Sequence, residues 1–308
     1  MATNNVKRID ITKPKIESVD ETFKSDNSYL NMFYKEISNL DTDIPLFYKN
    51  LRTLTFEKDE SLCTKKQVAA YYYPAFNKIV TNSKEEKQQL SHELLHMASS
   101  LVTDDFTYIG FYQKNKKDGW QVGEALNEGF TNSLDYRLFK DIIPCKEKTI
   151  KEVYPISTRI CDNLEFTLET KRLLDSYFKA DLRTIYEYLS KLMGKDATLA
   201  FLYSYDALFR CCDDCSKIRP IMLRLLYPDI DIYVAEAFYT KITDKYRSGA
   251  LDSASYKDYL EVVREILMDR IWFDKVPITP KVIGAYPYIE KRYNDKYKIR
   301  EKNNCLVK

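Results

Sequence analysis

The chain contains only two histidines, His92 and His96, and both lie in one short pattern, H-E-x-x-H, in which Glu93 follows the first. Four residues turn an α-helix through about 400°, so histidines at this spacing lie one turn apart on the same face. Their imidazole nitrogens can then bind one metal ion. Glu93 lies about 100° around the helix from His92, beside such an ion and not on it. The pattern predicts a metal-binding helix, and the rest of the fold has to accommodate it.

The H-E-x-x-H pattern is typical of helices that hold zinc with two histidines and carry a glutamate general base. Imidazole nitrogens bind Zn²⁺ at about 2.0–2.1 Å, and the metal lowers the pKa of a bound water toward ~7. Glu93 is then placed to take a proton from that water. The alternative is that His92 and His96 are ordinary core or surface residues of a helix.

The neighbouring residues predict an amphipathic helix over about residues 84–102. Ser83 and Glu86 have the spacing of a capping box, in which a hydroxyl and a carboxylate satisfy free backbone N–H groups at a helix start. Apolar residues then recur at helical spacing, at Leu90, Leu94, Met97, Ala98 and Leu101. The two histidines are therefore expected on a helix and not in a loop.

A catalytic zinc site needs three protein ligands and one position left for water. Because no third histidine exists, the remaining ligand must be a carboxylate or a thiolate. The metzincin continuation H-x-x-G-x-x-H is absent, since Ser99 stands at the glycine position and Val102 at the ligand position. That class of zinc site is excluded.

A second motif, N-E-G-F-T, occupies Asn127–Thr131. It resembles the second zinc helix of the gluzincins, whose N-E-G-[FY]-[AT] segment supplies a glutamate ligand. The resemblance implies that Glu128 is the third ligand, 32 positions after His96. Glu124, four residues earlier on the same helical face, and Asp105 remain alternatives.

The same resemblance assigns a role to Asn132. In thermolysin-like gluzincins an aspartate one turn after the glutamate ligand accepts a hydrogen bond from a ligand histidine, which fixes the tautomer of the ring. Asn132 stands at that place and can act through its amide oxygen, without the charge. No G-x-M-E-N segment, which holds a free substrate amine in the aminopeptidase branch, is found. Endopeptidase activity is favoured, and exopeptidase activity stays open.

Gluzincins also use a tyrosine or histidine to stabilise the oxyanion that forms during attack on a peptide carbonyl. With no histidine left, a tyrosine is expected, and one such donor supplies about 2–4 kcal/mol. Tyr154, which precedes Pro155, is the first candidate among 25 tyrosines, and Arg159 is a second candidate for the same role.

Composition limits the other possibilities. The chain has 48 Lys and Arg residues against 46 Asp and Glu residues. This near balance gives no indication of a nucleic-acid partner. No apolar stretch is long enough to span a membrane, and no apolar segment follows Met1, so a cytoplasmic location is expected, with leaderless secretion left open. Cys211, Cys212 and Cys215 lack a second pair, and we interpret them as free thiols. The oligomeric state is not indicated.

The predicted fold class is α+β and zincin-like, with a small, mostly antiparallel sheet beside the zinc helix and a predominantly helical C-terminal lobe. The expected segments are a flexible arm (1–27), a catalytic lobe (28–140), a helical lobe (141–290) and a polar tail (291–308). Helices are predicted over 28–38, 44–51, 124–140 and 182–193. Strands are predicted over 51–56, 67–73 and 78–81, and a hairpin over 108–122.

Three lysines, Lys114, Lys116 and Lys117, lie in the connecting loop of that hairpin. They are either solvated loop residues or residues that steer an acidic substrate. The predicted function is that of a zinc metalloendopeptidase that hydrolyses a peptide or protein substrate, with Glu93 as base and then proton shuttle. The alternatives are a zincin-fold binding or regulatory protein, and a toxin or effector protease with one narrow substrate.

Overall fold

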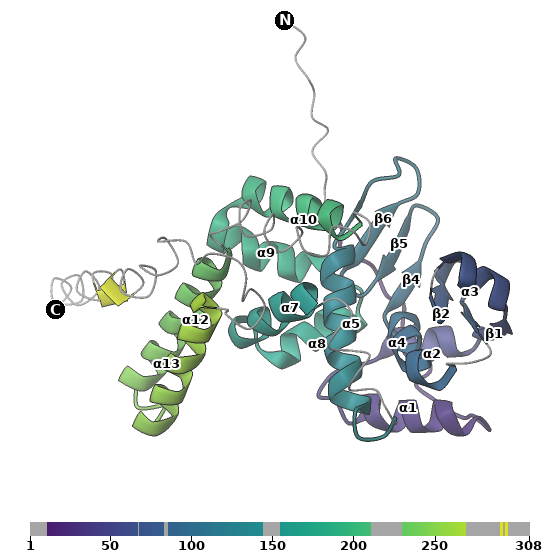
Figure 1. Ribbon diagram of the computed structural model, residues 1–308, viewed down its shortest axis with the longest axis horizontal. Helices are drawn as coiled ribbons and strands as arrows, with labels where there is room; N and C mark the ends of the chain where they lie inside the picture. The colour runs from purple at the N-terminus through teal and green to yellow at the C-terminus, as the bar shows by residue number, and fades with distance from the viewer. Residues whose placement is uncertain are drawn as a thin grey trace, which may run out of the picture.

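The computed structural model describes residues 11–66, 68–82, 86–143, 155–210, 230–268, 290–291 and 293–294. Tyr154, the capping serine Ser83, the Cys211–Cys215 cluster and most of the predicted polar tail lie outside these residues. The described chain is an α+β structure with two small sheets (Figure 1). Among the described residues, no helix combines the length and the apolar character needed to cross a membrane.

Sheet A has three strands in the order β1 (Thr55–Lys58), β3 (Lys78–Thr81) and β2 (Ala70–Tyr73). Strands β2 and β3 pair antiparallel across the short 3₁₀ helix η1 (Pro74–Phe76), as predicted, whereas β1 pairs parallel to β3. Strand β2 is an edge strand. The strand predicted over 51–56 begins later, at Thr55, because Leu51 belongs to α2 (Pro45–Leu51) and the next two residues form a turn.

Sheet B is wholly antiparallel and has the order β4–β5–β6–β7. Its strands are β4 (Ser100–Val102), β5 (Phe106–Ile109), β6 (Tyr112–Asn115) and β7 (Gln121–Val122). The single predicted sheet is therefore two sheets. The predicted hairpin over 108–122 is a three-strand meander that turns once at Gly110–Phe111 and again between Asn115 and Gln121.

The helix with the two histidines, α4, spans Glu86–Ala98, so the prediction that it reaches residue 102 was wrong. At the end of the helix, the backbone N–H and the hydroxyl of Ser99 both donate to the carbonyls of Leu95 and His96, and β4 begins at the next residue, Ser100. Leu101 is buried as predicted, but in β4, where it pairs with Tyr108. Pairing with the neighbouring strand β5 thus overrides the helical spacing of Leu101.

Helix α5 (Glu124–Phe139) lies between sheet B and the helical part of the chain (Figure 1). It packs on α4 and on α7, and one cluster of buried apolar residues joins α1, α4 and α5 to the helical part. The helical part comprises α7 (Pro155–Leu168), α8 (Thr170–Phe178), α9 (Leu182–Met193), α10 (Lys195–Arg210), α12 (Ile230–Arg247) and α13 (Ser253–Met268).

The N-terminal residues 11–27 form no helix or strand, yet they contact the core. Ile11 is 3% exposed, and the Thr12 hydroxyl lies 2.9 Å from that of Tyr108 on sheet B. Phe23 stacks on Tyr34 of α1 (Ser28–Ser38), with ring centroids 4.2 Å apart. The first part of the segment is thus fastened to sheet B, and its last part is fastened to α1.

Candidate metal centre

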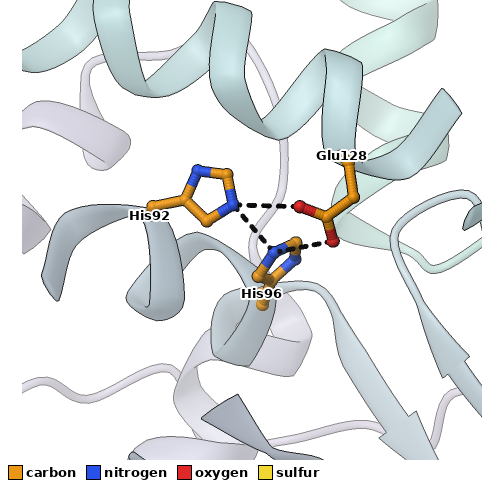
Figure 2. A group of neighbouring side chains, drawn as sticks. All are labelled: His92, His96 and Glu128. Carbon is orange, nitrogen blue, oxygen red and sulfur yellow. Dashed lines mark hydrogen bonds and ion pairs between the residues drawn. The ribbon is translucent and has the colours of Figure 1, made fainter. Parts of the chain in front are cut away.

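Three side chains from two helices converge at one point (Figure 2). Helix α4 supplies His92 and His96, whose Nε2 atoms lie 3.0 Å apart. Helix α5 supplies Glu128, whose carboxylate oxygens lie 3.2 Å from His92 Nε2 and 3.3 Å from His96 Nε2. The three ligand atoms all lie within 4.8 Å of one another, so one small ion can contact all of them.

The charges of the group depend on one another. Burial lowers the pKa of His92, but the hydrogen bond and the charge of Glu128 outweigh burial and raise it to about 8. Burial also opposes ionisation of Glu128, yet the charge of His96 and the hydrogen bonds from both histidines hold its pKa well below the usual range. The cluster thus stabilises a positive charge next to the ionised Glu128 carboxylate. Two imidazole nitrogens and one carboxylate oxygen form a donor set of catalytic zinc sites.

Glu93 lies beside the three-residue group and not in it. Its side chain is buried, and its Oε2 accepts a hydrogen bond of 2.7 Å from the backbone N–H of Tyr72 on β2. Because this N–H points at Glu93, it points away from β3, and the sheet ladder is left intact. The edge strand of sheet A therefore fixes the orientation of the glutamate carboxylate.

A residue that the sequence interpretation missed, Asn127, joins sheet B to the site. Its Nδ2 lies 3.3 Å from Nδ1 of His96, and its Oδ1 accepts a hydrogen bond of 3.2 Å from the backbone N–H of Phe111. A partner on the second ring nitrogen fixes the orientation of a ligand histidine. The available signal was the asparagine of N-E-G-F-T, directly before Glu128.

The other residues of that motif fit α5 into its surroundings. A Cβ at Gly129 would lie 2.2 Å from the backbone carbon of Ser157, so glycine permits the close approach of α7. Phe130 is 1% exposed and lies in the core. The Thr131 hydroxyl donates to the Asn127 carbonyl at 2.7 Å and lies 2.7 Å from the hydroxyl of Tyr177 on α8.

The remaining predicted residues occupy several places. Asn132 lines the cleft that also holds the three-residue group, and its Nδ2 donates to the Thr158 hydroxyl at 3.0 Å. Glu124 forms an ion pair with Arg210, and Asp105 forms one with Lys117. Neither acid belongs to the His92–His96–Glu128 group. The Tyr154 side chain and the Arg159 side chain lie outside the described residues.

A buried carboxylate anchors the start of α5. Asp206 on α10 accepts hydrogen bonds from the backbone N–H groups of Gly123, at 2.7 Å, and Ala125, at 2.9 Å. Burial raises the pKa of Asp206 to about 6, although the Ala125 N–H and the charge of Arg210 act in the opposite direction. The helix that carries Glu128 is thereby tied to the helical part of the molecule.

The metal group lies in a cleft of about 980 Å³ between the two sheets. One wall follows β2 of sheet A from Ala70 to Tyr73, and the other contains Thr107, Ile109, Tyr112 and Lys114 of sheet B. A cleft of this size that holds a few converging polar groups is typical of a ligand-binding site.

No match was found among models of known protein families, among curated proteins or among solved structures. The site is therefore defined by its own geometry. It consists of a His₂Glu group that can hold a metal ion, with a second carboxylate beside it, in a cleft of an α+β protein.

Proposed function

We propose that this chain is a zinc-dependent metallopeptidase of the gluzincin type, with a zincin-like catalytic lobe, and that it cleaves within peptide chains. The observation that carries the proposal is the convergence of His92, His96 and Glu128 within 4.8 Å. These residues come from two segments, H-E-x-x-H and N-E-G-F-T, that lie more than thirty positions apart in the sequence. Their donor set suits Zn²⁺, for which two histidines and a glutamate leave one position open.

His92, His96 and Glu128 would hold the ion. Zinc bound there supplies a Lewis acid that polarises a peptide carbonyl and lowers the pKa of water. Glu93 takes a proton from the attacking water and delivers it to the leaving amine. The hydrogen bond from the Tyr72 N–H supports this role, because it keeps the carboxylate in a single orientation on the cleft side of α4.

The edge position of β2 supports a peptide substrate. An extended peptide can add to a free sheet edge through backbone hydrogen bonds, which hold chains of many sequences. Strand β2 is the outer strand of sheet A and lies along the cleft, beside the metal group; its Tyr72 N–H is taken by Glu93, so a peptide would pair with the other outward backbone groups of the strand. An open cleft with walls from both sheets accommodates a chain that continues on either side of the cleaved bond.

The test combines metal analysis with peptide cleavage for three full-length proteins: wild type, Glu93→Gln and Glu128→Ala. We expect about one zinc per chain in wild type and in Glu93→Gln, weaker zinc binding in Glu128→Ala, and cleavage of an unbiased peptide library by wild type alone. Peptides with free and blocked N-termini then separate endopeptidase from exopeptidase activity.

Each other outcome has a defined meaning. Equal zinc in all three proteins would remove Glu128 from the ligand set. Bound zinc without cleavage of any library peptide would favour a binding or regulatory protein, or an effector protease with one narrow substrate. A folded wild type that binds no zinc would refute the proposal.

A further inference from the structure

The sheet B wall of the cleft has a definite set of side chains. Thr107 pairs with Lys114 across β5 and β6, and Ile109 pairs with Tyr112, so these four residues share one face. All four line the cleft. The alternate residues point the other way: Tyr108 and Gln113 are buried, and both contact Thr12.

Tyr112 is held as a hydrogen-bond donor. The Gln121 side-chain amide lies 2.9 Å from the Tyr112 hydroxyl at one end and 2.9–3.2 Å from the Arg210 guanidinium at the other. A guanidinium can only donate, so the amide oxygen faces Arg210 and the amide nitrogen donates to the Tyr112 oxygen. The phenol hydrogen of Tyr112 is then directed to an acceptor other than Gln121. Burial raises the pKa of this phenol above its ordinary value, so it stays neutral.

The three lysines of the predicted hairpin loop differ in their surroundings. Lys116 donates to the Thr103 carbonyl, and Lys117 forms an ion pair of 2.6 Å with Asp105. Lys114 lines the cleft, and it forms no ion pair or side-chain hydrogen bond within the described part of the chain. Glu124, a nearby acid of the cleft, is already paired with Arg210. The positive charge of Lys114 thus stays available to a ligand.

We propose that Thr107, Tyr112 and Lys114 form a donor patch that binds a carboxylate of the peptide substrate. An ammonium group, a phenol and a hydroxyl on one face provide charge-assisted hydrogen bonds, which a carboxylate accepts. The carboxylate belongs either to an Asp or Glu side chain or to the C-terminus of the peptide. This inference rests on the proposed peptidase function, because that function makes the cleft a peptide site.

The test measures binding and not turnover. Four pools of fluorescein-labelled octapeptides combine Glu or Gln at the same positions with a free or an amidated C-terminus. Their affinities for full-length Glu93→Gln protein are measured by fluorescence anisotropy, with added zinc and with a chelator. The same measurement is made after a further Lys114→Gln, Tyr112→Phe or Lys116→Gln substitution.

We expect the affinity for the preferred carboxylate pool to be at least about tenfold higher than for its uncharged counterpart, because hydrogen bonds to charged groups are stronger than those between neutral groups. Lys114→Gln should abolish this preference, and Tyr112→Phe should reduce it several-fold. Lys116→Gln makes the same change of net charge outside the cleft and should leave it intact. A preference for Glu over Gln would identify a side-chain carboxylate, and a preference for the free over the amidated C-terminus would identify the terminal one.

Three results would overturn the donor patch: equal binding of charged and uncharged pools, equal losses in Lys114→Gln and Lys116→Gln, or no binding of any pool. Failure of the peptidase proposal has a different signature. In that case zinc is absent or the wild type cleaves nothing, while the carboxylate preference and its dependence on Lys114 persist.

Discussion

The two sheets flank the same cleft, but each holds its half of the candidate site in a different way. Sheet A reaches Glu93 through a backbone group, the N–H of Tyr72 on its edge strand. Sheet B reaches His96 through a side chain, since Asn127 lies between the Phe111 N–H and the Nδ1 of His96. The candidate base therefore depends on main-chain geometry, and the candidate metal ligand depends on the identity of one residue.

This difference predicts different tolerance to substitution. Every residue except proline has a backbone N–H, so most changes at position 72 leave the contact with Glu93 in place. On the sheet B side, the contact needs the side chain of Asn127 itself, and it needs Gly110 to have no side chain. Substitutions on the sheet B side should therefore have the larger effects on the metal centre.

Gly110→Ala should have the largest effect. Gly110 has φ +52°, and a Cβ there would lie 2.3 Å from Asn127 Oδ1 and 2.5 Å from the Tyr177 ring. Because both neighbours are packed in the core, we expect a loss of about 3 kcal/mol or more in the free energy of unfolding, measured with urea, together with weakened zinc binding.

Gly119→Ala is the matched control for Gly110→Ala. Gly119 also has a positive φ, +71°, but a Cβ there meets nothing within 4 Å. Only the left-handed backbone conformation opposes the alanine, so the loss should be about 1 kcal/mol. Equal losses in the two variants would show that contact with Asn127 and Tyr177 is unimportant.

Asp206 should make the attachment of α5 depend on pH. Burial raises its pKa from 3.8 to about 6, so the folded state binds the proton more tightly than the unfolded chain. Its contribution to the free energy of unfolding is fully present below about pH 4 and is lost as the pH rises through about 6. The total change across this window is roughly 3 kcal/mol.

The measurement is the free energy of unfolding between pH 4 and pH 7 for wild type and Asp206→Asn. The difference between the two proteins isolates Asp206 from other groups that titrate in the same range. We expect this difference to change across the window and then to level off above about pH 6. A constant difference would mean that the Asp206 pKa is unperturbed, with Arg210 and the two backbone N–H groups offsetting burial.

Asn127→Ala should weaken zinc binding about 10–100-fold, as is usual when the hydrogen-bond partner of a ligand histidine is removed. Competition with a chromophoric chelator measures this affinity. Asn132→Ala is the control, because the Nδ2 of Asn132 donates to Thr158 on α7. If Asn132→Ala weakens zinc more than Asn127→Ala, the role predicted for Asn132 is supported and the bridge from sheet B is secondary.

Tyr72→Phe should have the smallest effect. It removes only a hydroxyl that donates to Asn77 Oδ1 at 3.0 Å, so about 1 kcal/mol of stability should be lost with peptide cleavage unchanged.

Tyr72→Pro is the contrasting variant, because it removes the N–H itself. An edge strand tolerates this loss because the group points away from the neighbouring strand. Cleavage should then fall at least tenfold with zinc retained, and full activity in Tyr72→Pro would contradict the role of the backbone donor.

Local patterns in the sequence were sufficient for several parts of the molecule. The repeat of apolar residues predicted α1, α5 and α9 to within one residue at each end. The four-residue spacing of His92 and His96 predicted one helical face, and the resemblance of N-E-G-F-T predicted the partner Glu128. A helix and its faces depend on the geometry of that helix alone, so the sequence by itself determines them; Glu128 could be predicted because a short motif resembles a known one, although its contact with α4 is tertiary.

Tertiary structure alone decided the rest. Pairing of β4 with β5 ended α4 at Ala98, because the strand partner competes with helical spacing at Leu101. The fold brought Asn127 to His96, and it separated Lys114 from Lys117, which lie three positions apart in one hairpin. These outcomes depend on contacts between different elements, either neighbouring strands such as β4 and β5 or separate helices such as α4 and α5, and the periodicity within one element carries no information about them.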